Sequence, residues 1–97
     1  MEINKKRIIE ELKGKKDELK ERGVKRIGLF GSYVKENQNK NSDIDFLVEF
    51  ENVSADNFFG VFFLLERLFN KKIDLIEIKN LRNELKNVLK EAQYVQI

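Results

Sequence analysis

Three short runs of β-forming apolar residues alternate with segments of helical periodicity, and this alternation constrains the fold of the 97-residue chain more than any other feature. The runs occupy residues 24–30, 44–50 and 73–78. Short apolar runs of this kind are typical of buried strands, and helices placed between strands cover the faces of a sheet. The sequence therefore predicts an α/β fold: a small mixed β-sheet flanked by helices in the order α-β-α-β-α-β-α.

The helical segments differ in their apolar surface. Residues 4–21 form one amphipathic helix in pattern, which Gly23 is expected to end. Residues 57–69 are rich in phenylalanine, and apolar side chains cover more than one side of that helix. Part of this surface is expected to meet another protein, in a homo-oligomer or a hetero-complex. A closing helix is expected to carry four apolar residues at helical spacing: Leu81, Leu85, Val88 and Leu89.

Length and composition limit the function classes. A chain of 97 residues has room for one domain, over residues 1–97, so a large substrate must be bound from outside. The net charge of +2 gives no sign of a dedicated nucleic-acid binder. The absence of cysteine and histidine excludes thiol nucleophiles, Cys/His zinc sites and Ser-His-Asp triads. Catalysis must then use carboxylates or a metal.

The amino-terminal segment carries no apolar signal core, and no stretch approaches the roughly 20 apolar residues needed to span a bilayer. The sequence predicts no membrane association, and we expect a cytoplasmic protein.

Two aspartates interrupt the second predicted strand. Asp43 and Asp45 are two residues apart, so their side chains share one face, with about 6.5 Å of backbone rise between them. Carboxylates this close repel one another unless a cation or a proton lies between them. Mg²⁺, which prefers oxygen ligands and keeps substrate phosphates as partners, is the natural cation. The alternative is an acidic pair beside a turn, with Ser42 and Asp43 capping the strand entry.

Asp74 is the third candidate ligand, because it lies in the next apolar run and a neighbouring strand can bring it to the same face. Three carboxylates can hold two metal ions roughly 3.5 to 4 Å apart, as nucleotidyl transfer requires. The alternative is a surface salt bridge from Asp74 to Lys71 or Lys72. Glu49 and Glu77 share these strands and are expected to face solvent.

Gly31 and Ser32 follow the first predicted strand directly. A glycine at a strand end lets backbone N–H groups approach phosphates closely, and a serine hydroxyl adds a donor. Alone the pair is weak evidence, but its order and spacing relative to the aspartates are specific.

The sequence contains Gly31-Ser32, then ten residues, and then Asp43-Ile44-Asp45. This order and spacing resembles the GS-x10-DxD motif of MNT-type nucleotidyltransferases, which are minimal members of the DNA polymerase β superfamily. The resemblance extends over the whole chain and includes the strand around Asp74. It implies that Asp43, Asp45 and Asp74 bind Mg²⁺, with two ions expected, and that Gly31 and Ser32 bind the triphosphate of ATP.

The resemblance also implies a biological role. Members of this family are commonly antitoxins paired with HEPN-domain toxins, and they transfer AMP from ATP to a toxin tyrosine. One departure is that Tyr33 and Lys35 stand where the family often has arginines. Tyr33 favours an alternative, in which the chain neutralises its toxin by binding alone. A third reading is transfer to a small molecule or RNA, although the chain has no added domain for such a substrate.

Overall fold

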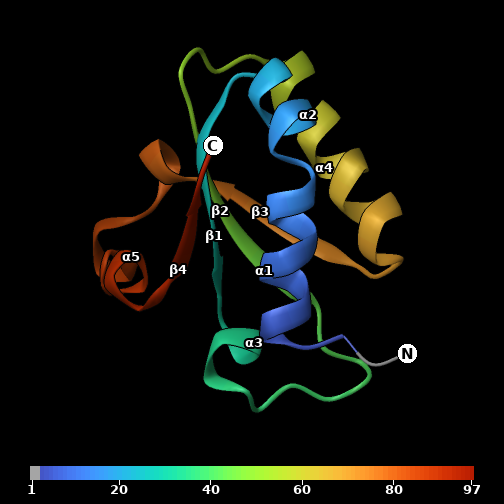
Figure 1. The fold of residues 1–97 in the computed structure, drawn as a ribbon. Helices are drawn as coiled ribbons and strands as arrows, with labels where there is room; N and C mark the ends of the chain where they lie inside the picture. Colours follow the sequence, from blue (N-terminus) through green and yellow to red (C-terminus); the bar gives the residue numbers. More distant parts are fainter. Residues whose placement is uncertain (1–2) are drawn as a thin grey trace.

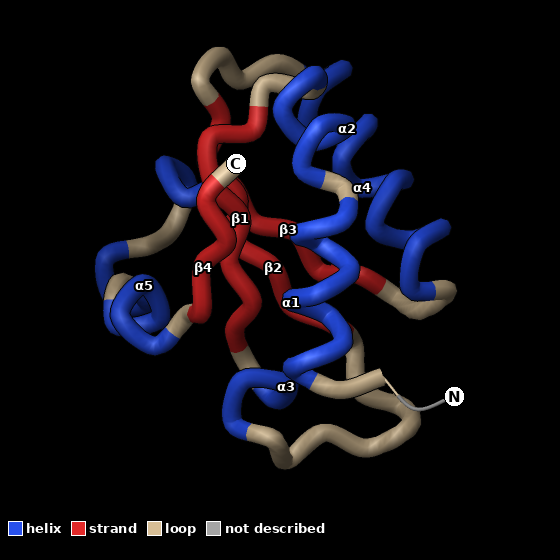
Figure 2. The backbone as a smooth tube through the Cα atoms, viewed as in Figure 1, coloured by secondary structure: helices blue, strands red, loops and turns tan. Residues whose placement is uncertain are grey.

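The computed structural model describes residues 3–97 and has a four-stranded mixed sheet at its centre (Figures 1 and 2). The strands are β1 Val24–Phe30, β2 Ile44–Phe50, β3 Ile73–Glu77 and β4 Gln93–Gln96. Their order is β3-β2-β1-β4; β1 is antiparallel to both of its neighbours, and β2 is parallel to β3. The first two strands have the predicted bounds, and the third ends one residue early. The α/β fold class is confirmed.

Three helices cover one face of the sheet (Figure 1). They are α1 Lys5–Gly14, α2 Lys16–Glu21 and α4 Ala55–Phe69. The helix predicted over residues 4–21 is thus broken directly after Gly14, a residue of low helix propensity. Gly23 ends α2 as predicted, with a positive φ of 81°. Of the residues that the model describes, none lies in a helix long and apolar enough to cross a membrane.

The core lies between the sheet and these helices. Alternation along β2 points Ile44, Phe46 and Val48 toward the helices, where all three are fully buried. The Phe46 ring stacks on Phe69 of α4 with 5.9 Å between centroids. The opposite face of the sheet is therefore free to carry polar groups.

The carboxyl-terminal segment crosses that opposite face (Figure 2). The predicted continuous closing helix is wrong, since the segment forms two 3-10 turns, η1 Ile78–Asn80 and η2 Asn83–Leu85, before the short helix α5 Asn87–Glu91. Asparagine favours turns because its side chain competes for backbone hydrogen bonds, and three asparagines fall in this stretch. The chain then returns as β4, a strand absent from the predicted order.

Candidate active site

Two of the predicted site residues are immediate neighbours in the sheet. The parallel register of β2 and β3 places Asp45 opposite Asp74. Adjacent strands lie about 4.8 Å apart, so the two side chains leave the sheet side by side. Because Ile44 and Phe46 point into the core, Asp45 projects from the face opposite α1 and α4. Asp43 precedes β2 on the same face and is exposed, as is Asp74.

The environment of Asp45 disfavours a negative charge. Its pKa is raised from 3.8 to about 6, first by burial, then by the charges of Asp74 and Asp43, and further by a hydrogen bond with Asp74. Two carboxyl groups can share a hydrogen bond only if one holds a proton. Above pH 6 Asp45 loses this proton, and the negative charge that then builds up on the three acids favours the binding of a cation.

Gly31 lies against Asp45. Phe30, the last residue of β1, is paired with Asp45, so the turn that follows passes directly over the carboxylate. Gly31 has a φ of 76°, and a Cβ on it would collide with the Asp45 carboxylate. Both the backbone conformation and the contact require glycine at this position. The predicted convergence of Gly31 and Asp45 is therefore present in the structure.

Ser32 begins α3 (Ser32–Lys35), a single turn whose amino end meets the aspartates. The first N–H groups of a helix have no intrahelical acceptor, so they are available to an anion. Figure 1 shows α3 at the same end of the molecule as the start of β2. One end of the sheet thus brings hydrogen-bond donors from α3 next to the acids.

The two positions that depart from the family pattern have different environments. Tyr33 is only 2% exposed and belongs to the hydrophobic core. It anchors α3 to the body of the protein. Lys35 is exposed at the end of α3 and is free to move toward an anion.

The donor set of this site fits a hard divalent cation. The ion pairs found within residues 3–97 include none of the three aspartates, and Lys71 instead donates to the Lys40 carbonyl at 3.0 Å. The salt bridge considered for Asp74 is thus not formed. Asp45 and Asp74 form a pair, and Asp43 contributes charge from farther off. Among residues 3–97 no three acids lie close enough together to hold a metal ion, so a site shared by the three aspartates would need side-chain movements.

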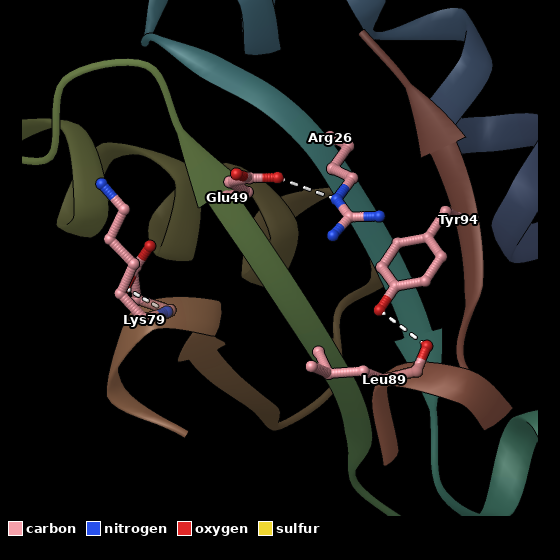
Figure 3. A network of polar contacts seen from close by, with 6 residues as sticks. Arg26, Glu49, Lys79, Leu89 and Tyr94 are labelled. Atoms are coloured by element: carbon pink, nitrogen blue, oxygen red, sulfur yellow. Dashed lines mark hydrogen bonds and ion pairs between the residues drawn. The ribbon is translucent and has the colours of Figure 1, made fainter. Parts of the chain in front are cut away.

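A polar network occupies the other end of the same sheet face (Figure 3). Arg26 Nε donates to Glu49 at 2.8 Å, and its guanidinium lies 4.4 Å from the centroid of the Tyr94 ring. The Tyr94 hydroxyl donates to the Leu89 carbonyl at 2.9 Å. These contacts fix β4 and α5 to the sheet and leave the aspartate end uncovered. The sequence alone does not predict this network, because the contacts of Tyr94 depend on the unpredicted β4 and the Arg26–Glu49 pair depends on the register of β1 against β2.

The prediction for the two glutamates was wrong. Glu49 is half-buried in its ion pair with Arg26, and Glu77 is only 4% exposed. Glu77 accepts the Lys79 N–H at 2.7 Å, which closes the turn after β3. This contact satisfies one carboxylate oxygen, and the other, Oε1, is buried without a hydrogen-bond partner among the residues that the structure describes.

The aspartates lie on an open edge of the protein. A cavity of about 560 Å³ is found nearby, lined by the start of α1, Tyr33, residues 38–40 and the end of α4. None of the three aspartates lines it. A site this open can receive a residue presented by a large partner.

Several known proteins are similar to this chain in sequence and in fold. The model of the nucleotidyltransferase domain family matches residues 6–95. The protein adenylyltransferase MntA of Thermococcus cleftensis is 42% identical over 83 residues, which cover 82% of this chain and 84% of that protein. A minimal nucleotidyltransferase of solved structure superposes with a TM-score of 0.71 at 26% identity, covering 88% of this chain and 93% of that one.

A further structure shares the fold at lower identity. It is the complex of a tri-AMPylated Shewanella oneidensis HEPN toxin with an MNT antitoxin, for which the TM-score is 0.61 at 19% identity, over 89% of this chain and 70% of that one. The family model covers most of the chain, and the sequence relative is similar over most of its own length. The chain belongs to the nucleotidyltransferase domain family.

Proposed function

We propose that residues 1–97 act as one nucleotidyltransferase domain that transfers AMP from ATP to a tyrosine of a HEPN-domain toxin in the cytoplasm. The observation that carries this proposal is the contact of Gly31 with Asp45 beside Asp74 on an open edge of the sheet. Support also comes from the similarity to a protein adenylyltransferase and from the fold shared with the antitoxin complex.

The proposed roles follow the geometry. Asp43, Asp45 and Asp74 supply carboxylate oxygens for Mg²⁺, and Gly31 and Ser32 bind the triphosphate. When bound, Mg²⁺ would neutralise charge on the carboxylates and on the phosphates. Burial and the neighbouring charges of Asp74 and Asp43 raise the pKa of Asp45, so a cation at this edge would stabilise its charged form.

The reaction joins the tyrosine oxygen to the α-phosphorus of ATP. The bond from that phosphorus to the bridging oxygen breaks, and pyrophosphate leaves with the electron pair. We assign the phenolic proton to Asp74, which is exposed and lies beside Asp45. The open edge lets the partner present its tyrosine in line with the leaving group.

The test is transfer of α-labelled AMP to a purified HEPN toxin from the same organism in the presence of Mg²⁺. Wild-type protein should label the toxin, and Asp45→Asn should reduce the rate by about a hundredfold or more, because a metal ligand is lost. Asp17→Asn, on the exposed surface of α2, is the matched control and should label normally. Equal rates for Asp45→Asn and wild type would refute the assignment.

Neutralisation of the toxin by contact alone is the alternative. This alternative rests on Tyr33, which stands where the family often has an arginine and lies buried in the core, so it supplies no positive charge to a phosphate. The Asp43→Ala/Asp45→Ala double variant separates the two functions in cells. Full protection by the folded variant would favour contact, and loss of protection would favour catalysis.

A further inference from the structure

Helix α4 carries an aromatic stripe on its outer side, defined here as Phe59 and Phe63. These side chains are 54% and 51% exposed, and their rings stack with 6.4 Å between centroids. Phe58 and Phe62 extend the stripe through edge contacts with centroid distances of 5.6 and 5.5 Å. Exposed phenylalanines in contact with each other form an apolar patch of the kind that marks an interface.

Phe59 and Phe63 are not part of the hydrophobic core. The inner side of α4 is already filled by four buried residues: Val61, Leu64, Leu65 and Phe69. Helix α4 lies on one face of the sheet (Figure 1), and the exposed stripe is on the side of α4 away from its buried residues. Asp45 projects from the opposite face of the sheet, because its neighbours Ile44 and Phe46 belong to the core under α4. A molecule docked on it would leave the aspartate edge open.

One opposite charge lies beyond each end of the stripe. Asp56 precedes Phe59 by three residues, and Arg67 follows Phe63 by four, so all four side chains share the outer side of the helix. Asp56 and Arg67 are exposed, and neither appears in the ion pairs of residues 3–97. Both charges are therefore available to a partner.

The stripe and its charges are self-complementary about a twofold axis. The midpoint of Phe59 and Phe63 is Val61, and the midpoint of Asp56 and Arg67 falls between Val61 and Phe62. If two copies of α4 pack antiparallel at this point, each stripe meets its counterpart and each Asp56 meets the Arg67 of the other copy. The contact extends over about 16 Å of helix at 1.5 Å per residue.

The Arg22 guanidinium packs over Gly60, so a further cation lies beside the stripe. The charges beyond the two ends of α4 extend the complementarity. Glu51 lies before the amino end of α4, while Lys71 and Lys72 follow its carboxyl end. An antiparallel pair brings the acidic end of one helix near the basic end of the other, whereas a parallel pair would place like charges side by side. The chain therefore supplies both halves of the interface.

We propose that this protein forms a twofold symmetric homodimer through antiparallel packing of α4, with the Phe59 and Phe63 stripes in contact and reciprocal Asp56–Arg67 ion pairs. Both active-site edges face outward in such a dimer, so two acceptor proteins can be modified without dissociation. The proposal does not depend on the identity of the acceptor or on transfer activity.

Sedimentation equilibrium of the full chain without a partner tests the proposal. We expect wild type to dimerise reversibly in the micromolar to submillimolar range. Asp56→Arg and Arg67→Asp should each weaken dimerisation by about tenfold, because each creates like-charge pairs at both symmetric positions. The double reversal, Asp56→Arg/Arg67→Asp, should restore it. Phe63→Arg should abolish it, and Lys90→Asp, exposed on α5 across the sheet, is the matched control.

Wild type that remains monomeric over this range would overturn the proposal. The antiparallel geometry would be overturned if either single reversal left dimerisation unchanged. It would also be overturned if the double reversal did not restore dimerisation. Circular dichroism of each variant separates loss of association from loss of folding. Transfer assays on the same variants distinguish failure of the dimer proposal from failure of the proposed function, because none of the changed residues lies on the aspartate edge.

Discussion

Asp45 on β2 and Asp74 on β3 occupy matching positions in a parallel strand pair, where burial and the charge of Asp74 raise the pKa of Asp45. Neighbouring acids in register destabilise a sheet when both are charged. The fold tolerates the pair because it lies at the edge of the structure, where Asp74 and Asp43 remain exposed. Holding these acids together has measurable consequences.

The first prediction concerns stability and pH in the absence of divalent ions. The pKa of Asp45 is raised to about 6 in the folded state, so the folded protein holds a proton that the unfolded chain loses near pH 4. The free energy of unfolding should therefore fall as the pH rises from about 4 to above 6. A shift of this size corresponds to about 3 kcal/mol, which solvent screening around the partly exposed group reduces to about 1 kcal/mol.

Urea denaturation of wild type and Asp45→Asn across this pH range measures the effect. The variant should lack this contribution and should be more stable than wild type at neutral pH. Asp17→Asn, which changes an exposed acid on α2, should follow the wild-type profile. Parallel profiles for wild type and Asp45→Asn would show that the pKa of Asp45 is not raised in the folded protein.

The second prediction concerns metal binding without nucleotide. Mg²⁺ should raise the Tm of wild type, because a ligand that binds only the folded state stabilises it. The rise should be smaller below pH 6, where protons compete for Asp45, and it should be largely absent in Asp45→Asn. Differential scanning fluorimetry with and without EDTA measures both effects. Equal rises in the two proteins would place the ion elsewhere.

The third prediction concerns Gly31. Gly31→Ala should destabilise the fold by about 1–3 kcal/mol, because the residue has a positive φ and a Cβ would collide with Asp45. Displacement of Asp45 should also reduce transfer to the toxin. Gly14→Ala is the matched control: nothing lies within 4 Å of its Cβ, and it should stabilise α1 by about 1 kcal/mol. Similar stabilities for the two variants would contradict the contact.

The fourth prediction concerns Tyr33. Because the side chain is buried, Tyr33→Ala should cost about 3–5 kcal/mol, and Tyr33→Arg, which restores a family residue, should also destabilise the protein. Tyr33→Phe should preserve both stability and nucleotide affinity. Lys35→Arg changes an exposed position and serves as the control for added arginine. Improved ATP affinity in a stable Tyr33→Arg protein would show that the tyrosine faces the nucleotide.

The sequence predicted those parts of the fold that rest on local patterns. The first two strands were located from apolar runs, and the expectation that Asp74 joins Asp45 followed from placing both on neighbouring strands. The strand β4 was missed because its four residues include one core side chain, Val95, which depends on pairing with β1 for its burial. The ion pair of Arg26 with Glu49 was missed for a related reason, since it requires the register of β1 against β2.

Strand direction determines what the active-site edge can bind. β1 runs opposite to β2 and β3, so its carboxyl end, with Gly31 and the amino end of α3, arrives at the amino ends of the two strands that carry Asp45 and Asp74. Backbone N–H donors and carboxylate oxygens therefore stand next to each other. A single edge can then accept an anion and a cation together, so a nucleotide and its counterion can be taken up as one neutralised unit.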